Sequence, residues 1–324
     1  MIVVTGGAGF IGSVFVAKLN DQGIDDIIVV DELGMSEKWK NLVKRRYADY
    51  LDKDAFLALV EADRGVPFPV EAVVHMGACS STTERDAGYL MENNYHYSCR
   101  LAEWARRHSL RFIYASSAAT YGDGSRGFSD DDEMTRALKP INMYGYSKQL
   151  FDLWVLRNGL VSSVAGIKFF NVFGPNEYHK ADMTSVVYKA FHQIREKGRV
   201  GLFKSYKPDY ADGGQKRDFV SVKECVEVLW WLLEHREVNG IFNLGTGQAR
   251  TWNDLIAAVF AALDRPPAID YIEMPEAIRG QYQYFTEARM DKLRAAGCPV
   301  AFAPLEETVG DYVKNHLLKA DPYL

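Results

Sequence analysis

The sequence has few cysteines and no long apolar run. Four cysteines, Cys79, Cys99, Cys225 and Cys298, are scattered through 324 residues without a CxxC pair. Reduced thiols are therefore expected, and no His or Cys cluster has the spacing of metal ligands. No apolar run reaches the roughly 18 residues that a membrane span needs. The chain opens on "MIVV" without the basic n-region of a signal peptide, so we expect a cytoplasmic protein with no membrane partner and no metal.

Neither sign of charge dominates the chain. Lysine and arginine number 38 against 43 acidic residues, a formal net charge of -5. This mild acidity argues against nucleic acid as the main partner. Because 48% of the residues are hydrophobic, the length allows a large core and suggests two domains, or one large domain with an appended lobe.

Apolar, β-rich runs alternate with helical patterns in the first half of the chain. The runs occupy residues 1–5, 27–31, 72–76, 111–116 and 164–172, and the helical patterns occupy 10–22, 52–63, 89–108 and 145–158. The runs show little alternation of apolar and polar residues, which is typical of parallel strands covered on both faces. The order predicts an α/β fold with a doubly wound parallel sheet of the Rossmann type.

The pattern changes after about residue 174, where polar, loop-like segments become frequent. We interpret residues 1–173 plus about 217–243 as a nucleotide-binding domain. A smaller, discontinuous substrate lobe is expected from about 174–216 plus 244–304, followed by a C-terminal helix in 305–324. Residues 204–216 are expected to form an exposed loop.

A glycine-rich loop follows the first strand directly and opens the first helix. Its sequence is "TGGAGFIG" (5–12), in which Gly6, Gly9 and Gly12 are three residues apart. Glycines allow the backbone to turn tightly, let a pyrophosphate approach, and let the helix pack on the strand. The helix N-terminus then faces the negative charge. The loop predicts a dinucleotide site.

The residues alone do not choose between NAD and NADP. Asp31 ends the second strand, about 20 residues after the loop, where a carboxylate accepts from the ribose 2′-hydroxyl. That favours NAD. Lys38 and Lys53 lie downstream and could neutralise a 2′-phosphate, which favours NADP.

The stretch "MYGYSK" (143–148) places a phenol and an ammonium one helical turn apart. Tyr144 and Lys148 then share a helix face, and Pro140 just upstream could open that helix. The ammonium is expected to lower the pKa of the phenol from about 10 toward working pH and to hold the nicotinamide ribose. Ser117 follows the fourth strand at its carboxyl end and supplies a hydroxyl to the same site.

Together these motifs resemble the extended short-chain dehydrogenase/reductase family. "RDFVSV" (217–222) and "IFNLGTG" (241–247) are similar to its C-terminal landmarks. The family includes nucleotide-sugar epimerases, dehydratases and reductases. The resemblance covers nearly the whole chain and implies a Rossmann fold with a nicotinamide cofactor.

Five further stretches resemble one branch of that family, the ADP-L-glycero-D-manno-heptose 6-epimerases. They are "HMGACSSTTERD" (75–86), "NNYHYS" (93–98), "FNVFGPNEYHKADMTSV" (170–186), "GQYQYFTEA" (280–288) and "LRAAG" (293–297). Such enzymes invert C6″ of ADP-D-glycero-D-manno-heptose, which supplies the inner core of lipopolysaccharide. The resemblance implies tightly held NADP, an ADP-heptose substrate and a homo-oligomer, with a pentamer as the family expectation.

The resemblance also implies roles for individual residues. The catalytic set is Tyr144 and Lys180 as two acid/base groups, with Lys148 and Ser117. The cofactor contacts are Gly6, Gly9, Phe10, Ile11, Gly12, Asp31, Glu32, Lys38, Lys53, Met76, Gly77, Ala78, Cys79, Ser80, Asn93, Lys148 and Val172. The substrate contacts are Ser117, Asn171, Asp182, Lys189, Phe203, Arg217 and Tyr282.

Three positions depart from that pattern. Met76 stands where relatives usually have Glu, Asp182 where Ser is common, and Lys189 where His is common. The 204–216 loop is also longer than usual. These departures bear on substrate contact and leave the acid/base pair intact. His179, beside Lys180, is expected to be structural or solvent-facing.

The alternatives differ in the residues that they require. A UDP-hexose 4-epimerase would share Ser117, Tyr144 and Lys148 but would not need Lys180. A dehydratase would need an acidic residue beside the serine, where "SSAAT" (116–120) offers alanines. A catalytically silent NADP-binding scaffold is disfavoured by the intact trio.

Overall fold

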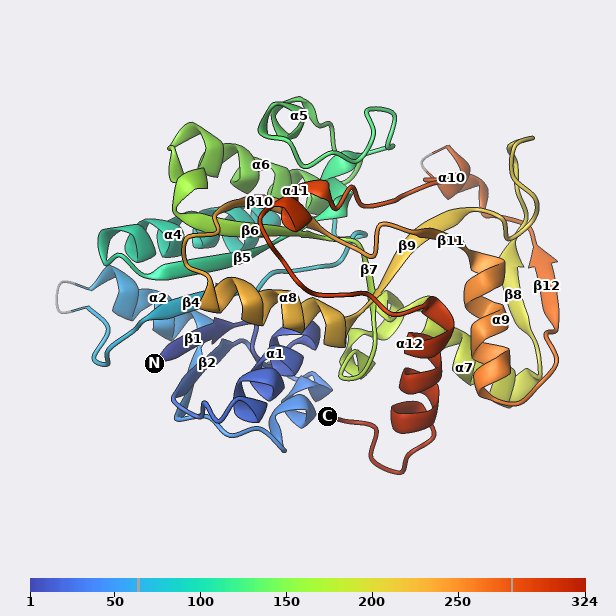
Figure 1. The fold of residues 1–324 in the computed structure, drawn as a ribbon, viewed down its shortest axis with the longest axis horizontal. Helices are drawn as coiled ribbons and strands as arrows, with labels where there is room; N and C mark the ends of the chain where they lie inside the picture. Colours follow the sequence, from blue (N-terminus) through green and yellow to red (C-terminus); the bar gives the residue numbers. More distant parts are fainter. Residues whose placement is uncertain (63–64, 281) are drawn as a thin grey trace.

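The computed structural model of the protein describes residues 1–62, 65–280 and 282–324 (Figure 1). The strands in these ranges are β1 (Ile2–Thr5), β2 (Ile27–Asp31), β3 (Asp49–Asp52), β4 (Ala72–His75), β5 (Arg111–Ser117), β6 (Val164–Phe169), β7 (Asn171–Phe173), β8 (Val200–Phe203), β9 (Lys216–Ser221), β10 (Gly240–Leu244), β11 (Ala249–Thr251) and β12 (Ile269–Ile272). The α-helices are α1 (Phe10–Asp21), α2 (Lys53–Glu61), α3 (Ala87–Leu90), α4 (Tyr97–Arg107), α5 (Asp132–Ala137), α6 (Met143–Arg157), α7 (Val186–Lys197), α8 (Val222–Glu234), α9 (Trp252–Ala262), α10 (Glu276–Arg279), α11 (Asp291–Ala295) and α12 (Leu305–Tyr312). Short helical turns are η1 (Glu37–Leu42), η2 (Met91–His96), η3 (Ala118–Tyr121), η4 (Leu160–Ser162), η5 (Tyr178–Met183) and η6 (Val313–Leu317).

The main sheet is parallel throughout. Its seven strands, counted over the described residues, run in the order β10-β6-β5-β4-β1-β2-β3. The chain leaves β1 toward β2 on one side and later returns to β4 on the other. In such sheets, ligands bind beyond the carboxyl ends of the strands where the order reverses. The predicted doubly wound fold is confirmed, and β1 and β4 mark its switch point.

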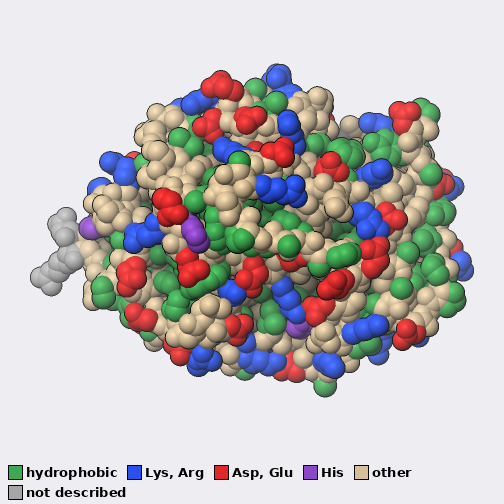
Figure 2. All heavy atoms as spheres, in the orientation of Figure 1, with side chains coloured by type: hydrophobic (Ala, Val, Ile, Leu, Met, Phe, Trp, Pro, Cys, Tyr) green, Lys and Arg blue, Asp and Glu red, His purple; other side chains and the backbone are tan. Residues whose placement is uncertain are grey.

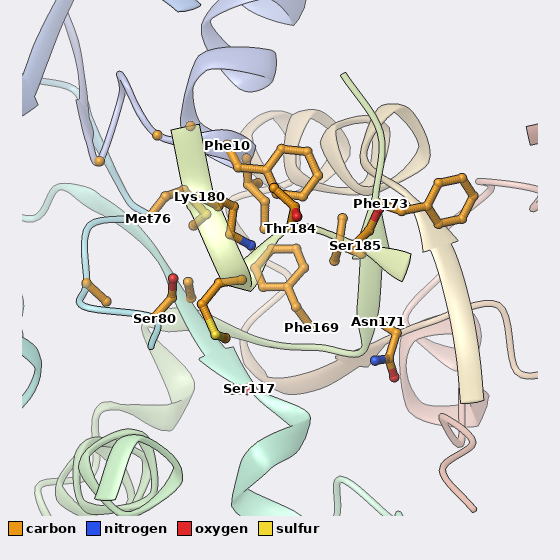
Figure 3. Close-up of a pocket in the computed structure, with 18 of the residues that line it drawn as sticks. Phe10, Met76, Ser80, Ser117, Phe169, Asn171, Phe173, Lys180, Thr184 and Ser185 are labelled. Carbon is orange, nitrogen blue, oxygen red and sulfur yellow. The ribbon is translucent and has the colours of Figure 1, made fainter. Parts of the chain in front are cut away.

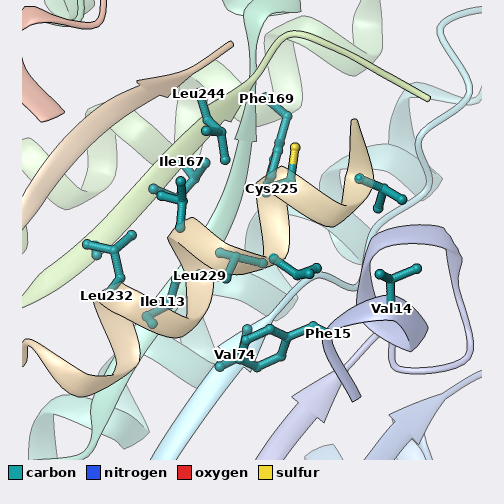
Figure 4. Close-up of a cluster of buried hydrophobic side chains, with 14 of the residues drawn as sticks. Val14, Phe15, Val74, Ile113, Ile167, Phe169, Cys225, Leu229, Leu232 and Leu244 are labelled. Carbon is teal, nitrogen blue, oxygen red and sulfur yellow. The ribbon is translucent and has the colours of Figure 1, made fainter. Parts of the chain in front are cut away.

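Helices cover both faces of this sheet, which explains why its strands are apolar on both sides. One face carries α1 and α8, and Figure 4 shows the α8 side chains Cys225, Leu229 and Leu232 beside strand residues such as Ile113 and Ile167. The other face is covered by α2, α4 and α6, whose side chains join those of the strands in a second apolar cluster, which includes Phe56, Trp104 and Phe151. Both clusters pack the helices against the strands of the main sheet.

The predicted strand 164–172 is in fact two strands. β6 pairs with β5 and β10 in the main sheet, whereas β7 pairs with β9 in a separate three-stranded sheet. Phe170 separates them, and its amide still donates to the Leu244 carbonyl at 3.0 Å. The chain therefore changes sheets at Phe170. Two strands of the main sheet, β3 and β10, were not among the predicted ones. β3 is a short, partly exposed edge strand, whereas β10 is buried throughout.

A third apolar cluster lies beyond β7, between α7, α9 and α12. The parallel pair β8 and β12 lies beside α9 at the right of Figure 1. The helix predicted near 305–318 is α12 followed by the π-helical turn η6. From there residues 318–324 run back toward α1, where the C label stands in Figure 1.

Basic and acidic side chains are interspersed on the face shown in Figure 2. No helix among the described residues is both long and apolar enough to span a bilayer.

Candidate active site

A cavity of about 620 Å³ lies at the carboxyl ends of the central strands. Many of the predicted site residues line it: Gly6, Gly9, Phe10, Ile11, Gly12, Asp31, Lys38, Met76, Gly77, Ala78, Ser80, Ser117, Tyr144, Lys148, Asn171, Val172 and Lys180. A smaller cavity of about 140 Å³ shares part of this wall and adds Glu32, Lys53, Cys79 and Asn93. The structure thus gathers residues from both halves of the sequence around one space.

The glycine loop is packed so tightly that side chains are excluded from it. A Cβ on Gly6, whose φ is +65°, would lie 2.6 Å from the Gly77 amide nitrogen. A Cβ on Gly12 would lie 2.1 Å from the Gly6 carbonyl oxygen. The loop after β1 therefore touches the loop after β4, and α1 begins at the cavity wall. The amides at this helix N-terminus suit a pyrophosphate.

Asp31 is buried at the end of β2 and is already neutralised. Its Oδ2 accepts from the Ala8 amide at 2.9 Å, and its Oδ1 accepts from Glu32 N at 2.8 Å and from Lys38 Nζ at 2.6 Å. Lys53 forms a looser pair with Glu32 at 3.3 Å. Two carboxylates and two ammonium groups therefore surround the smaller cavity.

Tyr144 lies in the first turn of α6, close to Ser117. The helix begins after Asn142, whose side chain accepts from Gly145 N at 2.7 Å, so Asn142 is its N-cap rather than Pro140. A Cβ on Gly145 would lie 2.6 Å from the Ala119 carbonyl. Gly145 thus allows α6 to approach the segment that carries Ser117. A hydrogen bond with Ser117 lowers the pKa of Tyr144, but burial has the larger effect and the net pKa is raised.

Lys148 shares the helix face with Tyr144, yet its ammonium points to the sheet. Its Nζ donates to the Ala115 carbonyl at 2.8 Å, and burial lowers its pKa to about 8, partly offset by the charge of Asp152. The prediction that Lys148 lowers the pKa of Tyr144 is therefore wrong for this structure. The phenol is buried, and the hydrogen bond that favours its ionised form comes from Ser117.

A buried polar network beneath α6 was missed by sequence reasoning. Asp152 and Lys168 are both fully buried, and their side chains meet at 2.7 Å. Asp152 also accepts from Ser116 Oγ at 2.7 Å and Tyr114 OH at 3.0 Å, while Lys168 donates to Thr120 Oγ1 at 2.9 Å. This network ties α6 to β5, β6 and η3. One feature of the sequence could have revealed it. Asp152 follows Lys148 by four residues, so the two side chains lie on the same face of the predicted helix.

Lys180 enters the same cavity from η5, an irregular segment. Its Nζ lies 5.1 Å from the centre of the Phe10 ring, and Figure 3 shows the side chain projecting into the cavity beside Phe10. Burial lowers the pKa of Lys180, with Lys189 acting in the same direction and Glu177 opposing them. A lowered pKa favours the neutral amine, the form that accepts a proton.

Five predicted substrate contacts lie outside this cavity. Arg217 is buried between the rings of Trp252 and Tyr282, with its guanidinium 5.7 and 5.3 Å from their centres. Phe203 packs edge-on against Tyr282 at 6.3 Å. Trp252 lines the cavity and donates from Nε1 to Tyr282 OH at 2.9 Å, so it joins this aromatic cluster to the cavity. Trp252 was not predicted.

The other two of the five, Asp182 and Lys189, lie at the exposed rim of the Lys180 segment. Lys189 Nζ donates to the Asp182 carbonyl at 2.6 Å. Neither residue lines the large cavity in this structure. Among the described residues, Arg217 forms no ion pair with its neighbour Asp218. The Asp218 carboxylate instead accepts from the backbone of Thr246 and Gly247 at 2.7 and 2.9 Å.

Two neighbours of predicted residues have clearer structural roles. His179 lines the cavity wall, where its Nδ1 lies 3.3 Å from Asn41 Nδ2 and burial lowers its pKa to about 4. Asn94, beside the predicted Asn93, is buried. Its Oδ1 accepts from Cys79 N at 2.8 Å, and its Nδ2 donates to Cys79 O at 2.9 Å and to Ser147 Oγ at 3.1 Å. The doubled "NN" gave no signal as to which asparagine points inward.

Known proteins match this chain over its whole length. An ADP-L-glycero-D-manno-heptose-6-epimerase of Nitratidesulfovibrio vulgaris (strain DP4) is 64% identical over 324 residues, which is 100% of both chains. The crystal structure of a Helicobacter pylori protein with the same name has a TM-score of 0.81 at 26% identity, covering 97% of this chain and 95% of that one.

A third protein differs in name but shares the fold. A Thermus thermophilus UDP-glucose 4-epimerase, solved as a complex with NAD, has a TM-score of 0.76 at 25% identity, covering 96% of this chain and 98% of that one. The sequence model of the NAD dependent epimerase/dehydratase family matches residues 2–245. With the glycine loop, Ser117, Tyr144 and Lys148 gathered at one cavity, the chain belongs to the NAD dependent epimerase/dehydratase family.

Proposed function

We propose that the protein converts ADP-D-glycero-D-manno-heptose to its L-glycero epimer with tightly held NADP. This reaction makes the heptose donor for the inner core of lipopolysaccharide. One observation carries the proposal: two titratable groups, Tyr144 on α6 and Lys180 on η5, enter one cavity from separate elements. The 64% identity to the N. vulgaris epimerase supports the choice of substrate.

The chemistry explains why two such groups are wanted. C6″ bears an unactivated C–H and lies outside the sugar ring. A bound nicotinamide supplies reversible oxidation of this carbon to a ketone. Rotation about the C5″–C6″ bond then presents either face of the ketone, and the oxygen occupies a different place in each pose. One residue cannot reach both places within hydrogen-bond range, so one acid/base group is needed for each.

The directions of the two pKa shifts suit this division of roles. The lowered pKa of Lys180 favours a neutral amine, which can take the hydroxyl proton as the ketone forms. The raised pKa of Tyr144 favours a neutral phenol, which can return a proton to the oxygen in the other pose. The Ser117 hydroxyl lowers the pKa of the phenol and so opposes the effect of burial, and Lys148 lines the same cavity. Each turnover leaves Lys180 protonated and Tyr144 ionised, and proton exchange with solvent returns both to their starting states. In the reverse direction the two residues exchange roles.

The cofactor preference rests on the smaller cavity. The glycine loop and the N-terminus of α1 fit a pyrophosphate, and Lys38 and Lys53 face the space beside Asp31. Because Lys38 neutralises Asp31 at 2.6 Å, the carboxylate repels a 2′-phosphate less than a free one would. We infer that the two lysines bind this phosphate.

Cofactor binding to Lys38→Met and Lys53→Met tests that inference. Each variant should lose roughly tenfold or more in NADP affinity, as expected for removing a charge-assisted hydrogen bond, with a smaller change for NAD. Lys40→Met, a half-exposed lysine of η1 paired with Glu37, is the matched control. Equal losses for NADP and NAD would remove the phosphate role of the lysines.

The substrate is tested by NMR of ADP-D-glycero-D-manno-heptose with wild type, Lys180→Met and the control Lys197→Met, an exposed lysine in the last turn of α7. We expect conversion by wild type and by the control, and a loss of about 10²–10⁴ in Lys180→Met. UDP-glucose in a parallel tube addresses the 4-epimerase alternative. Conversion of UDP-glucose alone by the loaded wild type would overturn the heptose assignment, and full activity of Lys180→Met would leave Lys180 without a role in the chemistry.

A further inference from the structure

We propose that residues 321–324 hold the Lys180 segment in its working position, and that Tyr178 and Asn176 are the positioning residues through which they act. The proposal rests on the acid/base role proposed above for Lys180. It concerns how that amine is kept at the cavity wall, which nothing within η5 itself explains.

The backbone around Lys180 is strained. Ala181, the next residue, has φ 47° and ψ −123°, which lies in a region that residues with a Cβ rarely adopt. Asn176, four residues before the lysine, has φ 72°. Such conformations cost about 1–3 kcal/mol each and persist only where surrounding contacts impose them. The segment that presents the amine must therefore be held from outside.

One set of contacts closes the base of this segment. The Glu177 carboxylate is buried and accepts from Ser185 Oγ at 2.7 Å and from the Ser185 amide. Lys180 N donates to the Glu177 carbonyl at 3.0 Å. These bonds join the two ends of the segment, but they do not fix the segment relative to the cofactor-binding half.

The second set comes from the far end of the sequence. Tyr178 OH donates to the Pro322 carbonyl at 2.9 Å, and the Tyr178 ring meets the Tyr323 ring edge-on at 5.0 Å. Leu324 N donates to Asn176 Oδ1 at 3.0 Å. Residues 322 to 324 thus contact the segment at two points on the N-terminal side of Lys180.

Those terminal residues and the segment share an anchor on the cofactor-binding half. Asn176 Nδ2 donates to Ser13 Oγ of α1 at 3.0 Å, and Asn41 Nδ2 donates to the Asn176 carbonyl at 3.1 Å. Lys44 contacts the Tyr323 carbonyl at 2.7 Å and Asp321 at 2.8 Å. In Figure 1 the terminal residues lie near α1. We call these contacts of residues 321–324 with Asn176, Tyr178 and Lys44 the clamp. The clamp fixes Lys180 relative to the elements that bind the cofactor.

Loss of the clamp should impair proton transfer rather than substrate binding. Proton transfer needs the amine within hydrogen-bond reach of the substrate oxygen. The predicted substrate contacts Phe203, Arg217 and Tyr282 belong to a different cluster. A displaced amine would thus slow only the half-reaction that uses Lys180 and leave the half-reaction of Tyr144 intact.

The test uses holoenzyme variants Tyr178→Phe and Lys44→Met, with Tyr188→Phe as the control. Tyr188 packs on the Tyr178 ring at 5.6 Å, so its variant removes a neighbouring hydroxyl but keeps the Tyr178 contact with Pro322. Transient cofactor reduction is followed at 340 nm, starting separately from each epimer. We expect Tyr178→Phe to slow one half-reaction roughly 3- to 10-fold, the effect of one hydrogen bond, with KM and the other half-reaction within twofold. Lys44→Met should slow the same half-reaction.

Unequal effects on the two epimers are the signature of positioning. Equal slowing of both half-reactions, or slowing that merely follows a lower Tm, would overturn the clamp and leave a purely structural role. If Lys180→Met is inactive while Tyr178→Phe and Lys44→Met match wild type, the clamp fails and the proposed function stands. If Lys180→Met is fully active, the role of Lys180 and the clamp fail together.

Discussion

Tyr144 and Lys180 reach the same cavity by different structural means. Tyr144 lies on α6, a 15-residue helix whose underside is tied to the main sheet by the buried Asp152–Lys168 pair. Lys180 lies on a short strained turn that is held by backbone groups of residues distant in sequence. The phenol is thus positioned by regular structure and the amine by a few specific contacts. We expect the two sites to respond to mutation differently.

The largest expected effect separates the two groups by direct removal. Tyr144→Phe and Lys180→Met should each lower epimerisation by about 10²–10⁴. Because each keeps one acid/base group, each should still oxidise one epimer and reduce the bound cofactor transiently. Stopped-flow absorbance at 340 nm with the two epimers checks this. If the two variants oxidise opposite epimers, Tyr144 and Lys180 each serve a different epimer. If both variants prefer the same epimer, this assignment of roles is wrong.

The next largest effect concerns the support of Tyr144. Asp152→Asn leaves the Lys168 charge buried without its partner, which should lower the free energy of unfolding by about 3–5 kcal/mol. The double variant Asp152→Asn/Lys168→Met removes that charge and should recover part of the loss. Urea unfolding followed by circular dichroism measures both. A double variant less stable than the single one would show that the pair stabilises the fold beyond mutual neutralisation.

A third effect is the dependence of kcat on pH that follows from the titration of Lys148, which shares the helix face with Tyr144. Burial lowers the pKa of Lys148 from 10.5 to about 8, so its ammonium loses its proton as pH rises through about 8. If catalysis uses the charged form, kcat should fall about tenfold per pH unit above that value. Arginine stays charged, so Lys148→Arg should flatten this alkaline limb while lowering kcat overall. An unchanged limb in Lys148→Arg would assign it to another group.

The smallest effect is expected at the strained residue beside Lys180. Glycine adopts positive φ without the penalty of a Cβ, so Ala181→Gly should change the free energy of unfolding by only about 1 kcal/mol, in the stabilising direction. The change in Tm on thermal unfolding shows whether Ala181→Gly stabilises or destabilises the protein. Gly198→Ala, at φ 71° in the C-cap of α7, is the converse control and should destabilise. Destabilisation by Ala181→Gly would mean that the strain at this turn is small.

The sequence was informative where local rules apply. The spacing of Tyr144 and Lys148 gave a shared helix face, and the glycine loop and Asp31 followed from strand, turn and helix signals in order. The parallel sheet followed from apolar runs without alternation. Each of these inferences uses a few residues that are close in the chain.

The rest depended on contacts that no local rule describes. The break at Phe170 required β9 as a pairing partner some 50 residues later. The direction of the Tyr144 pKa required burial, which the spacing of Tyr144 and Lys148 does not contain. Trp252 joined the cavity only because α9 packs beside β9. The lysine segment itself was identified by resemblance, since an isolated lysine in a polar loop has no physical signature of its own.

The return of residues 322–324 to Asn176 and Tyr178 also has a consequence for biosynthesis. The network beneath Tyr144 is complete once Lys168 has emerged from the ribosome. The lysine segment acquires its last contacts only after residue 324 has emerged, roughly 8–30 s later at about 5–20 residues per second. A nascent chain can therefore complete the network beneath Tyr144 well before its second acid/base group is secured, and a chain that ends before residue 321 would lack the contacts that hold Lys180 in place.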